Sequence, residues 1–126
     1  MLKKMLATAG LVAGLALAAP SGAFADTGYQ SRTVDPGQTW CLQDSVLGTS
    51  TAHGEGAVLS GHNVRFTFGT FSPVVKTVFD SAVPVSAFAF DATPYNTRNV
   101  FPGRFQACAI NQSLKTSSVR LYVSSQ

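Results

Sequence analysis

The chain has 126 residues, 45% of them hydrophobic and 12% charged, and a formal net charge of +3. This length is sufficient for one domain and short for two. The basic residues are scattered along the chain, which excludes an extended phosphate-binding stripe, so we expect no nucleic-acid partner.

Residues 1–25 have the three parts of a secretory signal peptide. Two lysines precede an apolar run over residues 6–19, and an A-x-A cleavage site ends at Ala25. The apolar run, about 14 residues long, is shorter than the roughly 20 that a membrane-spanning helix needs. Its composition is typical of a bacterial export signal. We therefore expect cleavage after Ala25, no membrane insertion, and a secreted protein with one domain over residues 26–126.

Residues 26–126 carry seven basic and six acidic side chains, a formal charge of +1, and two cysteines, Cys41 and Cys108. In an oxidising compartment an even number of cysteines indicates a disulfide, and here one pairing is possible. The chain-entropy model assigns roughly 4 kcal/mol of stabilisation to a bridge that closes so long a loop. We expect a disulfide-bonded monomer; the alternative is a pair of unpaired buried thiols.

Valine, threonine and phenylalanine are abundant in residues 26–126, whereas glutamate occurs once and methionine is absent. β-branched and aromatic residues favour strands, and no long segment has a helical period. DPGQ at 35–38 and FPGR at 101–104 predict type II turns with a positive φ at each glycine. A longer break covers residues 48–56. The segments between the breaks predict short strands near residues 29–34, 38–46, 57–60, 63–71, 74–79, 83–90, 104–110 and 118–123.

Several of these segments alternate between apolar and polar residues. In NVRFTF, residues 63–68, the valine and both phenylalanines share one face, and SVRLYV, residues 118–123, alternates likewise. Trp40 and Leu42 share a face typical of a core, which leaves Cys41 on the opposite face and predicts a peripheral disulfide. Roughly eight short strands in a chain of this size predict an all-β fold, a small antiparallel β-sandwich, with a small β-barrel as the alternative.

His53 and His62 flank the sole glutamate, Glu55, in the segment TAHGEGAVLSGHN. Zinc hydrolases use H-E-x-x-H on a helix, whereas the spacing here is H-x-E-x₆-H among glycines. Small polar residues and glycines are typical of an exposed connection, so we expect a loop, no metal and no cofactor, and little effect of replacing both histidines. The alternative is a non-helical metal site that adds Asp44 or Asp91.

Catalytic motifs are also missing. Ser60 in VLSGH lacks the first glycine of the G-x-S-x-G nucleophile elbow, and neither histidine has an evident aspartate partner in the sequence. The cysteines are assigned to the disulfide, which leaves no thiolate. Each carboxylate stands among turn residues, where hydrogen bonding to the backbone is the ordinary role. The sequence therefore indicates that the protein is not an enzyme.

The longest connection without alternation runs over residues 91–105. It contains residue types that make contacts at interfaces, namely Tyr95, Asn96, Arg98, Asn99 and Phe101. These five are the candidate binding residues. The alternative is a solvated loop in which Tyr95 and Phe101 fold back on the core.

Two other features have weaker functional interpretations. Trp40, Tyr29 and Tyr122 could form an aromatic platform for a sugar ring, although Trp40 fits a core position better. The segment NQS at 111–113 matches the glycosylation acceptor pattern. We therefore expect a small secreted binding domain whose partner is an unidentified extracellular protein or polymer. The alternative is a proteinaceous inhibitor of a secreted hydrolase, which would need a rigid, extended loop at 91–104.

Overall fold

The computed structural model describes residues 25–26 and 28–126. The predicted signal peptide therefore lies outside the described residues, apart from Ala25. Nine strands and no helix are present in the described part, and none of its segments is a helix that could cross a membrane. The strands are β1 (Ala25–Asp26), β2 (Gln30–Val34), β3 (Thr39–Gln43), β4 (Ala52–Ser60), β5 (Arg65–Ser72), β6 (Lys76–Asp80), β7 (Ala87–Ala92), β8 (Arg104–Ile110) and β9 (Ser117–Ser125).

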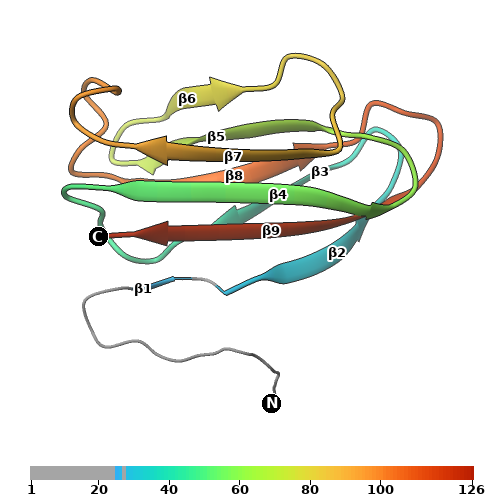
Figure 1. Cartoon of the computed structure of the whole chain (residues 1–126), viewed down its shortest axis with the longest axis horizontal. Helices are drawn as coiled ribbons and strands as arrows, with labels where there is room; N and C mark the ends of the chain where they lie inside the picture. The colour runs from blue at the N-terminus through green and yellow to red at the C-terminus, as the bar shows by residue number, and fades with distance from the viewer. Residues whose placement is uncertain (1–24, 27) are drawn as a thin grey trace.

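The strands form two antiparallel sheets packed face to face, which confirms the predicted β-sandwich. The front sheet has the order β2-β9-β4-β7, and the back sheet has the order β3-β8-β5-β6 (Figure 1). The short strand β1 also pairs with β9, at the C-terminal end of β9, after the part of β9 that pairs with β2. The two sheets each keep two edge strands and do not close on one another, so the alternative of a barrel is wrong.

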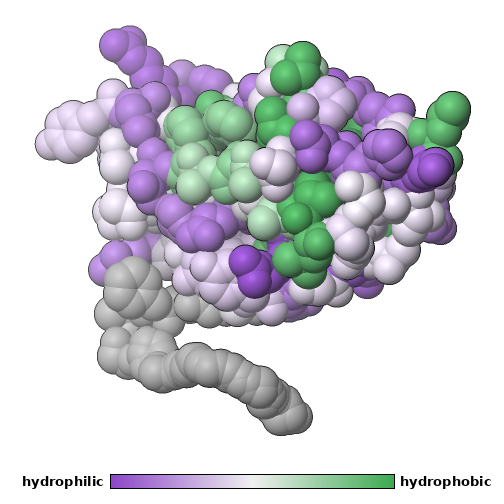
Figure 2. Space-filling view, turned by 45° about the vertical axis from the view of Figure 1, so that its right-hand side comes forward, coloured by the Kyte–Doolittle hydropathy of each residue, from purple (hydrophilic) through white to green (hydrophobic). Residues whose placement is uncertain are grey.

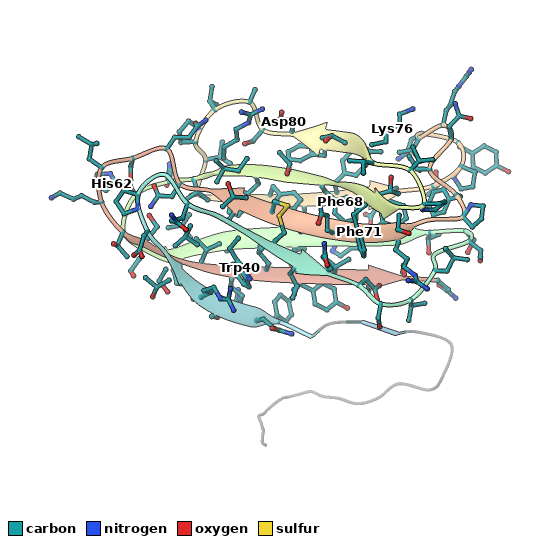
Figure 3. All side chains as sticks on the ribbon, turned by 180° about the vertical axis from the view of Figure 1, so that it is seen from behind. Trp40, His62, Phe68, Phe71, Lys76 and Asp80 are labelled. Carbon is teal, nitrogen blue, oxygen red and sulfur yellow. A yellow bond between two sulfur atoms is a disulfide. The ribbon has the colours of Figure 1, made fainter. Side chains whose placement is uncertain are left out.

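The core lies between the sheets and is built by the alternation that the sequence predicts. Its most deeply buried large apolar side chains are Phe66, Phe68, Phe105, Leu121, Val34, Val64, Val119 and Val123. Trp40 is also buried, as its alternation with Leu42 indicates, and the guanidinium of Arg32 covers its ring at 5.5 Å from the centroid. Figure 3 shows Phe68 between the layers and Trp40 on β3, on the side toward β2.

The disulfide joins Cys41 of β3 to Cys108 of β8, as predicted. These residues are directly opposite each other in the register, with their Cα atoms 4.0 Å apart. The bridge lies on the outer side of the back sheet, because the neighbouring Trp40 and Leu42 face inward (Figure 3). Such a bond is typical of proteins in oxidising compartments outside the cytosol.

The largest departure from the predicted strands is β4, which begins at Ala52 and includes most of the segment expected to be a loop. Gly54 and Gly56 face the core rather than breaking the strand. A Cβ on Gly54 would lie 2.4 Å from the Phe68 ring, and one on Gly56 would lie 2.5 Å from the Phe66 ring. Both positions therefore require glycine, because a large aromatic ring packs directly against the backbone of β4 at each of them. The loop predicted from these glycines is wrong at residues 52–56, which belong to the strand.

The two Pro-Gly segments differ from each other. Gly37 has the positive φ, 76°, that a type II turn requires. Gly103 has no positive φ, so the predicted type II turn at 101–104 is wrong. Glycine is needed there for a different reason, because a Cβ would lie 2.2 Å from the carbonyl oxygen of Val100.

Asn111, the potential glycosylation acceptor, is fully buried. Asn111 directly follows β8, and its Nδ2 donates hydrogen bonds to the carbonyl oxygens of Val34 and Lys115. These bonds connect the end of β8 to the end of β2 and to the turn that leads into β9. The folded domain therefore offers no accessible amide nitrogen at this position, and the side chain has a structural role.

Candidate functional site

A chain of contacting polar and aromatic side chains crosses the outer face of the front sheet. It contains Arg120, Tyr29, Tyr122, Glu55, His53 and Asp91, and we call it the outer-face network. β4 supplies His53 and Glu55, which share the face opposite Gly54 because successive side chains alternate. β9 and β7 supply their neighbours through the register, in which Tyr122 is opposite Glu55 and Asp91 is opposite His53.

His53 lies between two carboxylates. Its Nδ1 is 2.5 Å from Oδ1 of Asp91, and its Nε2 is 2.6 Å from Oε2 of Glu55. The contact with Asp91 follows from the pattern of hydrogen bonds between β4 and β7. Val58 N–H donates to the carbonyl of Ser86, directly opposite it, so the hydrogen-bonded pairs are those of the even-numbered residues of β4. His53 and Asp91 are thus a non-hydrogen-bonded pair, the type in which opposite side chains approach most closely.

The two carboxylates determine the charge of the His53 ring. Partial burial alone would lower its pKa, but hydrogen bonds to Glu55 and Asp91 and their negative charges outweigh this, and the pKa is raised above its ordinary value of 6.5. A ring with both nitrogens bonded to carboxylates donates two hydrogen bonds when it is protonated. The site therefore favours an imidazolium held between two anions.

The aromatic half of the network begins beside Glu55. The Tyr29 hydroxyl donates to Oε1 of Glu55 at 3.1 Å, and the Tyr29 ring stacks on Tyr122 with centroids 4.7 Å apart. The guanidinium of Arg120 lies over the Tyr29 ring at 4.9 Å, and the Tyr122 ring is 6.1 Å from the His53 ring. Aromatic rings, carboxylates and cations are thus connected over the face of β9, β4 and β7, together with Tyr29, which directly precedes β2.

A pocket of about 390 Å³ lies at the Asp91 end of the network. Thr51 and His53 of the β4 side, Asp91 and Thr93 of the β7 side, and Ser124 of β9 contribute to its wall. The pocket therefore combines hydroxyl groups, a carboxylate and an imidazole at an open surface.

The second histidine is not part of this site. His62 follows the end of β4 and lies at one extremity of the sandwich (Figure 3), while His53 is near the start of the same strand. Its backbone carbonyl accepts a hydrogen bond from Ser117 Oγ at 2.6 Å. The two histidines thus lie toward opposite ends of β4, and the structure does not bring them into one site.

Within residues 28–126, no group of three or more histidine, cysteine, aspartate or glutamate side chains has a geometry that could hold a metal ion. Both nitrogens of His53 already contact carboxylates, so neither is open to a metal or to a serine hydroxyl. Asp44, the other aspartate considered from the sequence, is buried and accepts a hydrogen bond from Ser125 Oγ.

The predicted binding residues of the 91–105 segment have different environments. Asn96 holds the loop together, since its Oδ1 accepts from Thr93 N–H and its Nδ2 donates to the Asp91 carbonyl. Phe101 packs against Phe105 in the core. Tyr95, Arg98 and Asn99 are exposed, and so is Asn96 in spite of its hydrogen bonds within the loop. Tyr95 does not fold back on the core, because 99% of it is exposed.

Sequence reasoning named Asp91 beside the histidines only in the alternative of a metal site, and did not predict its hydrogen bond to His53. The two residues are 38 positions apart, and no spacing rule connects them. It also treated Tyr29 and Tyr122 as part of a platform with Trp40, whereas the two tyrosines stack with each other and Trp40 is in the core. The alternation of SVRLYV, which places Tyr122 outward with Arg120, was the available signal for this face.

Comparisons with known proteins add a likeness in fold. No protein-family model matches the chain, and no curated protein matches it. A solved CBM4 carbohydrate-binding module is 18% identical, with a TM-score of 0.44 over 75% of this chain and 80% of the module. A protein of the Bacillus endospore appendages, which form a family of disulfide-linked pili, is 11% identical, with a TM-score of 0.47 over 90% of this chain and 98% of its own.

The sequence predicts little effect of replacing both histidines, but the two carboxylate contacts of His53 lead us to expect that His53→Gln changes how stability depends on pH. A pKa raised in the folded state means that the protonated ring contributes its full stabilisation below pH 6.5, and that this contribution is lost as the pH rises through the folded pKa. The wild type should therefore melt about 5 °C above His53→Gln at pH 5.5, the effect of about 1 kcal/mol, and the difference should shrink by pH 9. Melting curves across this range measure it.

His62→Gln is the matched control, because this histidine is exposed at the far end of β4. Its melting temperature should follow that of the wild type at every pH. A constant difference between wild type and His53→Gln would show that the ring contributes packing rather than charge.

Proposed function

We propose that this protein is an exported, non-enzymatic binding domain that holds a neutral, hydroxyl-rich polymer, a polysaccharide, on the outer face of its front sheet. The disulfide and the predicted signal peptide support export. The single observation that carries the proposal is the continuity of the tyrosine stack with the His53 carboxylate cluster on one face.

The charges of the outer-face network favour a neutral ligand. Arg120 and a protonated His53 contribute two positive charges, and Glu55 and Asp91 contribute two negative ones, so the network sums to zero. An ion of either sign would face both attraction and repulsion there. Hydroxyl groups, in contrast, donate to carboxylates and accept from imidazolium or guanidinium groups. A sugar chain can therefore bind the anionic and the cationic side chains of the network at the same time.

The aromatic part of the face supports the same ligand class. Tyr29 is 56% exposed and is braced by Tyr122 and Arg120, so ordering it on a ligand costs little conformational entropy. Tyrosine offers apolar contact area together with a polar hydroxyl, which suits a ligand with both C–H and O–H groups. The open face and the adjoining pocket allow a chain to pass across several strands.

Two observations weigh against the other candidate functions. Acid–base catalysis by His53 needs a ring nitrogen free to exchange a proton with substrate, whereas both of its nitrogens are bonded to carboxylates. An inhibitor needs an extended loop, whereas the segment after β7 is a compact turn closed by Thr97 N–H and Oγ1 on the Thr93 carbonyl, at 3.0 and 2.6 Å.

Tyr122→Ala is expected to weaken polysaccharide binding about tenfold, which corresponds to about 1.4 kcal/mol, because it removes the ring that braces Tyr29. Affinity electrophoresis in gels containing neutral glucans, xylans, mannans or galactans measures the retardation of wild type and variant. Circular dichroism confirms that the variant is folded. The expected result is retardation of the wild type by at least one neutral polymer and its loss in the variant.

Two further variants locate the binding surface. Leu114→Ser changes an exposed side chain in the β8–β9 turn and should bind like the wild type. Tyr95→Ala tests the loop predicted from the sequence and should also bind like the wild type. The proposal fails if no neutral polymer retards the protein, or if Tyr95→Ala loses binding while Tyr122→Ala keeps it.

A further inference from the structure

Three edge strands of the sandwich, β2, β6 and β7, differ in how well they are protected against pairing with another strand. β6 carries Lys76 and Asp80 and has a register shift against β5, and β2 carries Arg32 at its centre. Charges and irregularities of this kind discourage edge pairing. β7, with the sequence AFAFDA, pairs with β4 over all six residues without a shift. Its one charge, Asp91, is held over the sheet face by His53.

The backbone of β7 presents three residues to the open edge. Because Val58 N–H donates to Ser86, the even-numbered residues of β7 direct their N–H and C=O groups toward β4. The odd-numbered residues, Ala87, Ala89 and Asp91, therefore direct theirs away from it. Val85, the odd-numbered residue before β7, follows the same rule: its N–H and C=O point away from β4 and bond to Val64 of the other layer.

Apolar side chains surround this edge. Leu59 is 50% exposed and Val83 is 58% exposed, and Ala87 and Ala89 are exposed on β7 itself. Figure 2 shows green, apolar side chains gathered on this side of the molecule. Beneath them, the Phe79 ring stacks on Phe88 across the mouth of the sandwich with centroids 5.1 Å apart. The exposed edge therefore combines backbone groups that bond to no neighbouring strand with apolar side chains around them, which is typical of an interaction site.

We propose that β7 pairs with β7 of a second copy of this chain, antiparallel, about a two-fold axis at Ala89. This register places Ala89 opposite Ala89 of the second copy and Ala87 opposite its Asp91, so all three outward-directed residues meet outward-directed partners. Phe88 then faces Phe90 of the second copy on the inner side, where aromatic cross-strand pairs are favourable. The front sheets of two copies become one continuous sheet.

Two-fold axes at Phe88 or Phe90 would use two of the three outward-directed residues, because the third would be opposite Val85 or Thr93, whose backbone groups are already bonded. The axes that pass through an outward-directed residue are distinguished by charge and by the backbone groups available. Centring the axis on Asp91 would oppose two carboxylates, which is unfavourable. Centring it on Ala87 would require Val85, whose backbone groups already bond to Val64. The Asp91 carbonyl accepts a hydrogen bond from Asn96 Nδ2, but a carbonyl oxygen can accept a second one, so the pair with Ala87 can still form.

The interface is an edge of six residues, so the dimer is expected to be weak and to depend on concentration. This differs from the monomer expected from the sequence, because edge protection cannot be evaluated before the sheet order is known. The two-fold axis of an antiparallel pair is perpendicular to the sheet, so both outer-face networks would lie on the same side.

Lysine substitutions at two neighbouring positions test the register. Ala89→Lys places two positive charges directly opposite each other on the axis and should abolish the dimer. Ala87→Lys, the matched control, places each lysine opposite Asp91 of the second copy and should preserve or strengthen it. Sedimentation equilibrium from about 10 μM to 1 mM, the range of weak interfaces, measures the mass of each protein without any ligand.

Ala89→Cys provides a second readout. Opposite residues in a hydrogen-bonded antiparallel pair have Cα atoms about 5.5 Å apart, a distance that a disulfide spans. Mild oxidation should crosslink Ala89→Cys into dimers, and Ala87→Cys should crosslink far less. A wild type that stays monomeric at about 1 mM, or equal behaviour of the two lysine variants, would overturn the proposal. Polysaccharide binding by monomeric Ala89→Lys reports separately on the outer face.

Discussion

Replacing Cys41 and Cys108 with alanine is expected to lower the free energy of unfolding by about 4 kcal/mol and the melting temperature by roughly 15 to 30 °C. The bridge connects residues separated by 67 positions, so it removes many conformations from the unfolded chain. It also fastens β3, an edge strand whose single neighbour in the sheet is β8, to the interior of the back sheet. The effect should be a large share of the stability of a domain this size.

Melting of the double variant and of the reduced wild type measures this effect. Cys41→Ala alone should lose as much as the double variant, because either change removes the bond, and this equality separates the crosslink from the packing of the two side chains. A loss below about 1 kcal/mol in the double variant would show that β3 is held without the bridge.

Gly54→Ala and Gly56→Ala are each expected to cost about 3 kcal/mol, the upper end of what overpacking a core costs. The added methyl group would lie 2.4 Å from Phe68 in one case and 2.5 Å from Phe66 in the other. Both rings are essentially inaccessible to solvent and are held by other aromatic side chains, so they have little room to move. Denaturant unfolding of each variant measures the loss.

A rescue variant separates overpacking from a change in backbone conformation. Phe68→Leu alone should destabilise by creating a cavity, but combined with Gly54→Ala it should cost less than the sum of the two single changes, since the methyl group fills the space of the ring. Gly56→Ala combined with Phe68→Leu is the matched control and should be closer to additive. A strictly additive Gly54→Ala, Phe68→Leu pair would contradict the explanation.

The sequence predicted most strands because alternation is a local signal. NVRFTF and SVRLYV each show which side chains face inward without reference to any other part of the chain, and both faces are as predicted. β4 was the exception, since glycine is common in turns and its sequence context does not reveal the ring that will cross it. Gly54 and Gly56 become intelligible only beside Phe68 and Phe66.

By itself, then, the sequence determined that this chain forms an all-β domain with one peripheral Cys41–Cys108 bridge, because composition, alternation and a lone cysteine pair need no knowledge of the neighbouring strands. The tertiary structure decided the candidate site. Sheet order and register bring Asp91 of β7 to His53 of β4, and Tyr122 of β9 to Glu55. A shift of one residue would turn these side chains to the other face, and the register that prevents it is set by the packing of both sheets as a whole.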